Sequence, residues 1–191
     1  MPSPPDARAI GRRRRFDELY AENHRQVLGY LLRRTDTTDD AADVFAETFL
    51  IAWRRLDELP AGEQARMWLY GTARRTLANY RRGERRRSAL AERLRADLAV
   101  RYQPPAFEGE LAEISVAFAR LPESDRELLS LVAWEGLDPG QIAAVLGCSR
   151  NAARIRLHRA RRKLADELAR GQRHETRPPQ AHAYLANGDI A

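Results

Sequence analysis

A run of basic residues in the last third of the chain is the pattern with the clearest chemical consequence. From Arg150 to Lys163 there are seven Arg or Lys residues and no acidic residue. Arginine pairs well with guanine edges and asparagine with adenine edges, so the start of this run, which includes Asn151, suits base recognition. The basic residues of 159–163 suit phosphate contacts, which add affinity without sequence information. The alternative interpretation is a solvated basic face on an ordinary helix.

This run divides into two faces when it is placed on a helix of about 100° per residue. Ala153, Leu157, Ala160 and Leu164 lie together and form the face expected to be buried. Ile155 lies on the opposite, polar face, where it is placed to touch a thymine methyl group. The residues that we expect to contact DNA are Ser149, Arg150, Asn151, Arg154, Ile155, His158, Arg159 and Arg162.

A row of acidic residues with helical spacing lies in the first half of the chain. From Asp36 to Glu47 there are five acidic residues and no basic one. An acidic face repels phosphate, so one interpretation is a basic protein partner and the other is a solvated face. Carboxylates along one helix without a histidine are poorly placed to surround a metal ion. We name as the acidic stripe the four that recur at steps of three or four residues: Asp36, Asp40, Asp43 and Glu47.

An arginine-rich segment with aromatic residues follows at 66–82. Leu69, Ala73 and Leu77 gather on one side of a helical wheel and are expected to be buried. Basic side chains beside an aromatic ring suit single-stranded nucleic acid, because the ring stacks on bases and arginines follow the phosphates. Trp68 is either this stacking residue or part of the core. The residues expected to contact DNA here are Trp68, Arg74, Arg75, Asn79, Arg81 and Arg82.

Helices are needed to position all these residues, and the helical signals form two blocks. Apolar spacing predicts helices at 16–33, 39–56 and 63–82, and a second helical block at 110–170. No strand-like alternation of any length is present in the sequence. We therefore expect an all-α fold of two small helical domains joined by a flexible linker.

The second block contains the signals of a short helix, a tight turn and a long helix. Asp138 can cap a helix with Pro139 at its first position, and Gln141 can reach back to the cap amide. Gly147 suits a helix end because it tolerates positive φ, and Ser149 can cap the next helix. This arrangement predicts a C-terminal helix-turn-helix domain.

Length and composition limit the remaining possibilities. The 191 residues carry a net charge of +6, and no apolar run reaches the roughly 18 residues of a membrane span. Cys148 is the only cysteine, which excludes an internal disulfide or a cysteine-cluster zinc site. We expect a cytoplasmic protein with a disordered basic arm at 1–15, helical domains at 16–83 and 111–170, a linker at 84–110 and a tail at 171–191.

Both blocks resemble the extracytoplasmic-function (ECF, group 4) sigma factors of bacterial RNA polymerase, within the sigma-70 superfamily. The resemblance does not extend to either tail. The segments that carry it are Asp40–Trp53, Arg66–Arg82, Ala119–Arg126, Leu128–Leu137, Gln141–Cys148 and Arg156–Arg161.

This resemblance implies a factor that directs core RNA polymerase to a promoter class, in response to a stress or envelope signal. It implies that the acidic stripe binds the clamp helices of the largest catalytic subunit. It also implies that 66–82 melts and reads the minus-ten element, that the loop at 57–65 helps to hold an extruded base, and that the helix-turn-helix binds the minus-thirty-five element. It further implies an anti-sigma factor as partner. We accordingly expect no enzyme activity, no cofactor or metal, no membrane insertion, and a monomer when free of partners.

The sequence departs from the family pattern at several of these positions. Ile155 stands where Ser is common and Ala153 where Val is common, and Asn79 replaces an Asp. Asp138 and Gln141 replace Ser and Glu but keep the capping chemistry. The change at Ile155 lies on the outward face, so it bears on which promoter sequence is recognised.

A second hypothesis is a free-standing helix-turn-helix regulator that binds operator DNA as a dimer. It accounts for the second block but leaves the acidic stripe and the 66–82 segment without a role. An enzyme acting on nucleic acid is a third hypothesis, and the sequence shows no phosphate-binding glycine loop and no clustered metal-binding or catalytic histidines.

Overall fold

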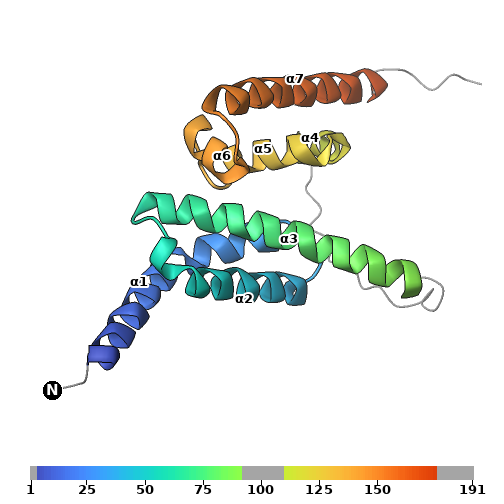
Figure 1. The fold of residues 1–191 in the computed structure, drawn as a ribbon. Helices are drawn as coiled ribbons and strands as arrows, with labels where there is room; N and C mark the ends of the chain where they lie inside the picture. Colours follow the sequence, from blue (N-terminus) through green and yellow to red (C-terminus); the bar gives the residue numbers. More distant parts are fainter. Residues whose placement is uncertain (1–3, 92–109, 176–191) are drawn as a thin grey trace, which may run out of the picture.

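Local capping signals set where several of the helices begin and end. Thr37 accepts a hydrogen bond from the backbone N–H of Asp40 and starts the second helix, and Gly147, at φ +65°, ends the sixth. The computed structural model describes residues 4–91 and 110–175 (Figure 1). The elements are α1 (Pro4–Leu32), α2 (Thr38–Arg54), the 3₁₀ turn η1 (Leu56–Glu58), α3 (Glu63–Ala91), α4 (Glu110–Arg120), α5 (Glu123–Ala133), α6 (Pro139–Leu146) and α7 (Arg150–Glu175).

The first block is a bundle in which α1, α2 and α3 each pack against the other two. Leu31 from α1 and Val44 from α2 are buried in its core. Leu69, Ala73 and Leu77 of α3 are buried too, as their spacing predicted. One side of the long α3 therefore packs against α1 and α2, and its other sides are left for other contacts.

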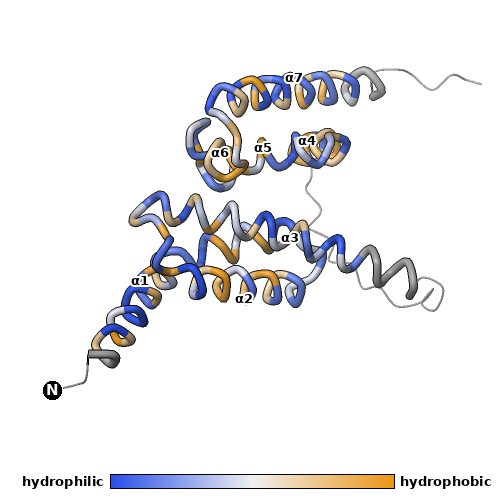
Figure 2. Tube along the Cα trace, in the orientation of Figure 1, coloured by the Kyte–Doolittle hydropathy of each residue, from blue (hydrophilic) through white to orange (hydrophobic). Residues whose placement is uncertain are grey.

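The second block packs α4, α5 and α6 against α7. Ala153, Leu157 and Ala160 are buried, and Leu164 packs at the edge of the same core, so the predicted buried face of α7 is confirmed. Figure 2 shows the resulting alternation of polar and apolar residues along this helix. The part of the chain that the structure describes contains helices and no strand, in agreement with the predicted all-α class.

The N-terminal arm differs from its prediction. The described part of residues 1–15 is helical, because α1 begins at Pro4. A proline is tolerated in a first helical turn, where the backbone N–H has no helical partner. Arg12 and Arg15 in this part of α1 bond to the last turn of α2 and to the residues after it, and these tertiary contacts stabilise a helix that local apolar spacing does not predict.

Two other helix ends also lie beyond their predicted limits. The helix α3 continues past Gly83 to Ala91, and α7 continues to Glu175, inside the predicted tail. Most of the predicted linker and tail lie outside the described residues. Within those ranges, 4–91 and 110–175, no helix is both long and apolar enough to cross a membrane.

The two blocks touch through α3 and α6. A Cβ added at Gly71 of α3 would lie 3.2 Å from the carbonyl oxygen of Val145 in α6, so the backbones approach closely. Gln141 of α6 donates to the Glu63 carboxylate of α3 at 2.6 Å. In Figure 1, α7 lies on the side of the second block away from α2.

Candidate nucleic-acid interface

The turn that orients α7 is stabilised by reciprocal capping bonds. Asp138 Oδ1 accepts from the backbone N–H groups of Gly140 (2.5 Å) and Gln141 (3.0 Å), and Gln141 Oε1 accepts from the N–H of Asp138 (2.8 Å). These backbone bonds hold the pKa of the Asp138 carboxyl below its usual value. Ser149 then caps α7 by accepting from the N–H of Ala152 at 3.2 Å. The predicted capping box and the second cap are thus confirmed.

The outward face of α7 is basic and accessible. Arg154, Arg159 and Arg162 have no carboxylate within ion-pair distance among the described residues. A basic helix face of this kind attracts a polyanion, because its charges are not neutralised within the molecule. The exposed residues on this face and at its start are Ser149, Arg150, Asn151, Arg154, Ile155, His158, Arg159 and Arg162.

One residue of the basic run has a structural partner instead. Lys163 Nζ bonds to Asp125 Oδ2 of α5 at 2.5 Å, and Asp125 is buried. Lys163 thus has a partner within the molecule, although its side chain is still half exposed. A buried carboxylate needs a counter-charge, and Lys163 is the described base that supplies it.

The helix α3 presents a second set of basic residues with mixed exposure. Arg74, Arg75 and Asn79 are exposed, as is Arg82, which donates to Asn79 Oδ1. Trp68 is half-buried and packs against the core. It is therefore part of the core on one side, and its exposed part is accessible for stacking.

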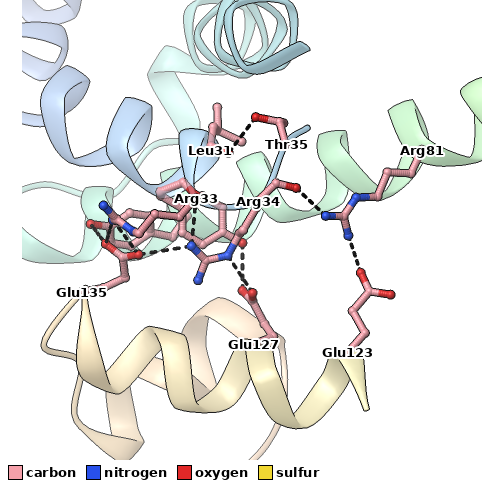
Figure 3. A network of polar contacts seen from close by, with 10 residues as sticks. Leu31, Arg33, Arg34, Thr35, Arg81, Glu123, Glu127 and Glu135 are labelled. Carbon is pink, nitrogen blue, oxygen red and sulfur yellow. Dashed lines mark hydrogen bonds and ion pairs between the residues drawn. The ribbon is translucent and has the colours of Figure 1, made fainter. Parts of the chain in front are cut away.

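Arg81 is the member of this set that is bonded across to the second block. It forms an ion pair with Glu123 at the start of α5 and donates to the backbone carbonyl of Arg34 at 2.5 Å. Its guanidinium is half-exposed and is engaged within the molecule in this arrangement (Figure 3).

The acidic stripe lies on α2 and just before it. Asp36, Asp43 and Glu47 are exposed, whereas Asp40 is half-buried and accepts a 2.5 Å hydrogen bond from the Tyr80 hydroxyl of α3. This bond, with burial second, raises the pKa of Tyr80 to about 12. Asp40 thus ties α2 to α3, which sequence spacing does not predict. No group of three or more metal-ligating side chains occurs in the described ranges.

A charged network joins the first block to the second, and Arg34 lies at its centre (Figure 3). Arg34 Nε donates to Glu127 at 2.7 Å and Nη1 donates to Glu135 at 3.3 Å, while the guanidinium lies 3.7 Å from the Tyr30 ring centroid. Tyr30 donates to Glu127 at 2.9 Å. The Arg34 and Glu135 side chains are only 8% and 3% exposed, so the charges are largely removed from water.

The rim of this network contains Arg33 and Tyr70, which both reach Glu135. Arg33 donates to both carboxylate oxygens, at 3.0 and 2.9 Å, and the Tyr70 hydroxyl lies 3.5 Å from one of them. Burial is the main cause that raises the pKa of Tyr70 to about 12 and that of Tyr30 further above its usual value. Both phenols therefore stay protonated as hydrogen-bond donors at neutral pH.

The sequence gives little sign of this network. Arg33 and Arg34 directly follow the C-terminal end of α1, near which basic residues are favoured by the helix dipole, so they need no distant partner to explain them. Glu127 and Glu135 are about a hundred residues away, at |i−j| = 93 and 101 from Arg34. Only the packing of the second block against the first, through α3 and α6, brings them together.

Comparison with protein-family models gives one match for each block. Residues 19–87 match the model described as Sigma-70 region 2, and residues 111–164 match the model described as Sigma-70, region 4. The first match contains α2 with its acidic stripe and the basic part of α3. The second contains the helix-turn-helix.

Individual proteins resemble the chain over most of its length. RNA polymerase sigma factor CnrH of Cupriavidus metallidurans is 32% identical over 170 residues, which cover 82% of this chain and 88% of that protein. ECF RNA polymerase sigma factor SigL of Mycobacterium tuberculosis is 29% identical over 149 residues, which cover 76% and 84%. RNA polymerase sigma factor YlaC of Bacillus subtilis is 26% identical over 165 residues, which cover 84% and 95%.

Solved structures show the same likeness. CnrH in complex with the cytosolic domain of CnrY matches with a TM-score of 0.54 and 29% identity, over 81% of this chain and 88% of that one. The sigma factor RpoE of Bartonella quintana, in complex with the anti-sigma factor NepR, matches with a TM-score of 0.61 and 20% identity, over 81% and 96%. The second likeness is one of fold.

Proposed function

The chain belongs to the ECF RNA polymerase sigma factors, and from this premise we propose how its two blocks divide the work of promoter-specific transcription initiation. The first block binds core RNA polymerase and the minus-ten element. The second binds the minus-thirty-five element. The observation that carries this division is the separation of charge: the acidic stripe lies on and just before α2, and the exposed face of α7 is basic.

The basic face of α7 recognises the minus-thirty-five element as duplex DNA. The reciprocal caps at Asp138 and Ser149 fix where α7 begins, which sets how its first turn enters the major groove. Arg150, Asn151 and Arg154 then face base edges, and Arg162 faces phosphate.

The exposed face of α3 binds the minus-ten element after the strands separate. Arg74, Arg75 and Arg82 follow the backbone of the unpaired strand, and the exposed part of Trp68 stacks at its edge. The loop between α2 and α3 (residues 55–62), which precedes this face, helps to accept an extruded base.

The exposed carboxylates of the acidic stripe bind a basic surface of the polymerase. Asp36, Asp43 and Glu47 are accessible, and they repel DNA, so they suit a protein partner. Asp40 contributes mainly by holding α3 beside α2 through Tyr80.

The two blocks must separate before both promoter elements are bound. Elements centred about 25 base pairs apart lie about 85 Å apart along B-DNA at 3.4 Å per pair. Here α3 and α6 are in van der Waals contact and the network around Arg34 is closed. We therefore assign this arrangement to the chain before it engages a promoter.

An anti-sigma factor is the partner expected to act on this closed arrangement. RpoE of Bartonella quintana was solved in complex with an anti-sigma factor, and CnrH with the cytosolic domain of CnrY. By this analogy, the present chain is released from such a partner by a stress or envelope signal. Its polymerase and DNA partners would keep it in the cytoplasm, and it carries out no catalytic step of its own.

The test is transcription by purified core polymerase from a promoter library, with two variants that affect different blocks. We expect Asp43→Arg to lose polymerase binding by about tenfold or more, because it places a like charge against a basic surface. Glu22→Arg makes the same charge change at another exposed site and is expected to bind normally. An intact complex with Asp43→Arg would remove the acidic stripe from the polymerase interface.

The second variant, Arg154→Ala, is expected to retain polymerase but to lose selectivity at the minus-thirty-five element. The loss corresponds to about 1–3 kcal/mol at one base position. Arg156→Ala, an exposed arginine on the same helix, serves as the matched control. A chain that ignores polymerase and instead protects a symmetric operator as a dimer would favour the free-standing regulator.

A further inference from the structure

The loop between α2 and α3 is bonded to the N-terminal part of α1. Arg12 donates to Asp57 Oδ2 at 2.5 Å and to the backbone carbonyl of Trp53 at 2.6 Å, and its guanidinium lies 5.1 Å from the Trp53 ring centroid. One turn further along α1, Arg15 donates to the backbone carbonyl of Leu59 at 2.8 Å. Two arginines of one helix face thus contact the last turn of α2 and two points of the loop that follows it.

The contacted points lie where α2 ends and the chain makes a short turn before α3. The carbonyl of Trp53 lies in the last turn of α2, where carbonyls lack a helical partner and a positive charge is favoured. The 3₁₀ turn Leu56–Glu58 is a single turn, and Leu59 is the last buried residue before the chain becomes accessible. Gly62 then takes a positive φ of +60° and α3 begins at Glu63.

These arginines lie outside the residues that match the Sigma-70 region 2 model, which begin at residue 19. Their contacts are therefore a property of this chain that the family match does not describe. The neighbouring Arg13 is exposed and makes none of these contacts. Position on the helix, and not charge alone, therefore decides which arginines contact the loop.

We propose that Arg12 and Arg15 are positioning residues that fix the α2–α3 loop and thereby determine which base the minus-ten site accepts. This inference rests on the proposed role of the loop in minus-ten recognition. A base pocket discriminates only if its walls are held in one geometry. The planar guanidinium of Arg12 suits this task, because it holds a side-chain oxygen and a carbonyl oxygen at the same time.

A simpler role for these residues is non-specific attraction of phosphate by a basic helix. The two roles differ in whether a lysine can take the place of the arginine. Lysine keeps the positive charge but lacks the planar fork, so it supports phosphate attraction and not the two-point contact at Asp57 and Trp53.

The experiment uses the full-length chain with core polymerase and a promoter library randomised at the minus-ten element. The bound fraction is sequenced for the wild type, for the double variant Arg12→Lys/Arg15→Lys, and for the control Arg13→Lys. We expect the double variant to lower base discrimination at one or more minus-ten positions by about threefold or more. Polymerase binding, minus-thirty-five preference and thermal unfolding are measured in parallel and are expected to stay close to wild type. The control is expected to match the wild type in every measurement.

Unchanged minus-ten preference in the double variant would overturn the inference. So would a weakening that is equal for all minus-ten sequences in Arg12→Ala/Arg15→Ala and absent in the lysine variant, since that pattern indicates phosphate attraction. A wild-type holoenzyme without any minus-ten preference would instead overturn the proposed function itself, and this inference with it.

Discussion

The helices α3 and α7 are both rich in arginine, but their arginines differ in whether they are paired within the molecule. On α7, Arg154, Arg159 and Arg162 are exposed and have no carboxylate partner among the described residues. On α3, Arg81 is paired with Glu123 and bonded to the carbonyl of Arg34, and the helix contacts α6. Charge in the sequence therefore does not by itself show which basic surface is available. In this arrangement these arginines of α7 are accessible, whereas Arg81 of α3 is engaged within the molecule.

The largest expected effect comes from breaking the network at its centre. Arg34→Ala leaves the Glu127 carboxylate, 17% exposed, without an arginine partner and takes one of its two arginines from Glu135, which keeps Arg33. Removal of one partner of a buried pair costs about 3–5 kcal/mol. The closed arrangement should lose more than a hundredfold in relative population. An increased radius of gyration in small-angle X-ray scattering would report the separation of the blocks.

Two further variants make this measurement decisive. Glu127→Gln keeps the shape of the side chain and removes its charge, so it should open the chain to a lesser degree. Arg120→Ala removes an exposed arginine and should leave the scattering unchanged. If Arg34→Ala and Glu127→Gln keep wild-type helix content and also the wild-type radius, the network does not hold the blocks together.

The second prediction compares the two basic helices directly through the salt dependence of DNA binding. In the free chain, Arg162→Ala should reduce the slope of log K against log salt by about 0.9, the value for one released phosphate contact. Arg81→Ala should leave that slope unchanged, because its guanidinium is engaged with Glu123 and Arg34. In the opened Arg34→Ala background, Arg81→Ala should reduce it. A reduction already present in the closed chain would contradict this difference between α3 and α7.

The smallest expected effect concerns the bond that ties α3 to the acidic stripe. The pKa of Tyr80 is raised to about 12 by the hydrogen bond to Asp40 and by burial, from an ordinary 10.0. A raised pKa means that the stabilisation is full below about pH 10 and is lost as the pH rises through about 12. The thermal unfolding temperature should therefore fall over this pH window by more in the wild type than in Tyr80→Phe.

Tyr30 and Tyr70, whose pKa values are also raised, remain in both of these proteins. The difference between the two unfolding curves thus isolates Tyr80. Curves with the same pH dependence would show that the Asp40 bond contributes nothing to the packing of α3 on α2.

The helix-turn-helix could be predicted from the sequence in considerable detail. Asp138, Gln141, Gly147 and Ser149 act through neighbours within a few residues, and all four behave as expected. The buried face of α7 follows from spacing alone. The outward placement of its basic residues follows as well, because a helix that buries one face must expose the other.

Other features depend on partners that are distant in the sequence. Lys163 looks like a phosphate ligand until Asp125 is placed beside it, and the start of α1 looks unstructured until Arg12 and Arg15 reach the α2–α3 loop. Local rules cannot assign such pairs, because each residue is equally well explained without its partner.

By itself, the sequence determined where most of the helices lie, their buried faces and the sign of the charge on each exposed face. Periodicity and capping are local, and charge is a property of composition, so none of these needs a tertiary contact. Only the tertiary structure decided which charges remain free. It removes Arg34 and Glu135 from water and leaves Arg154 in it, because pairing depends on which helices pack together and not on which residues they contain.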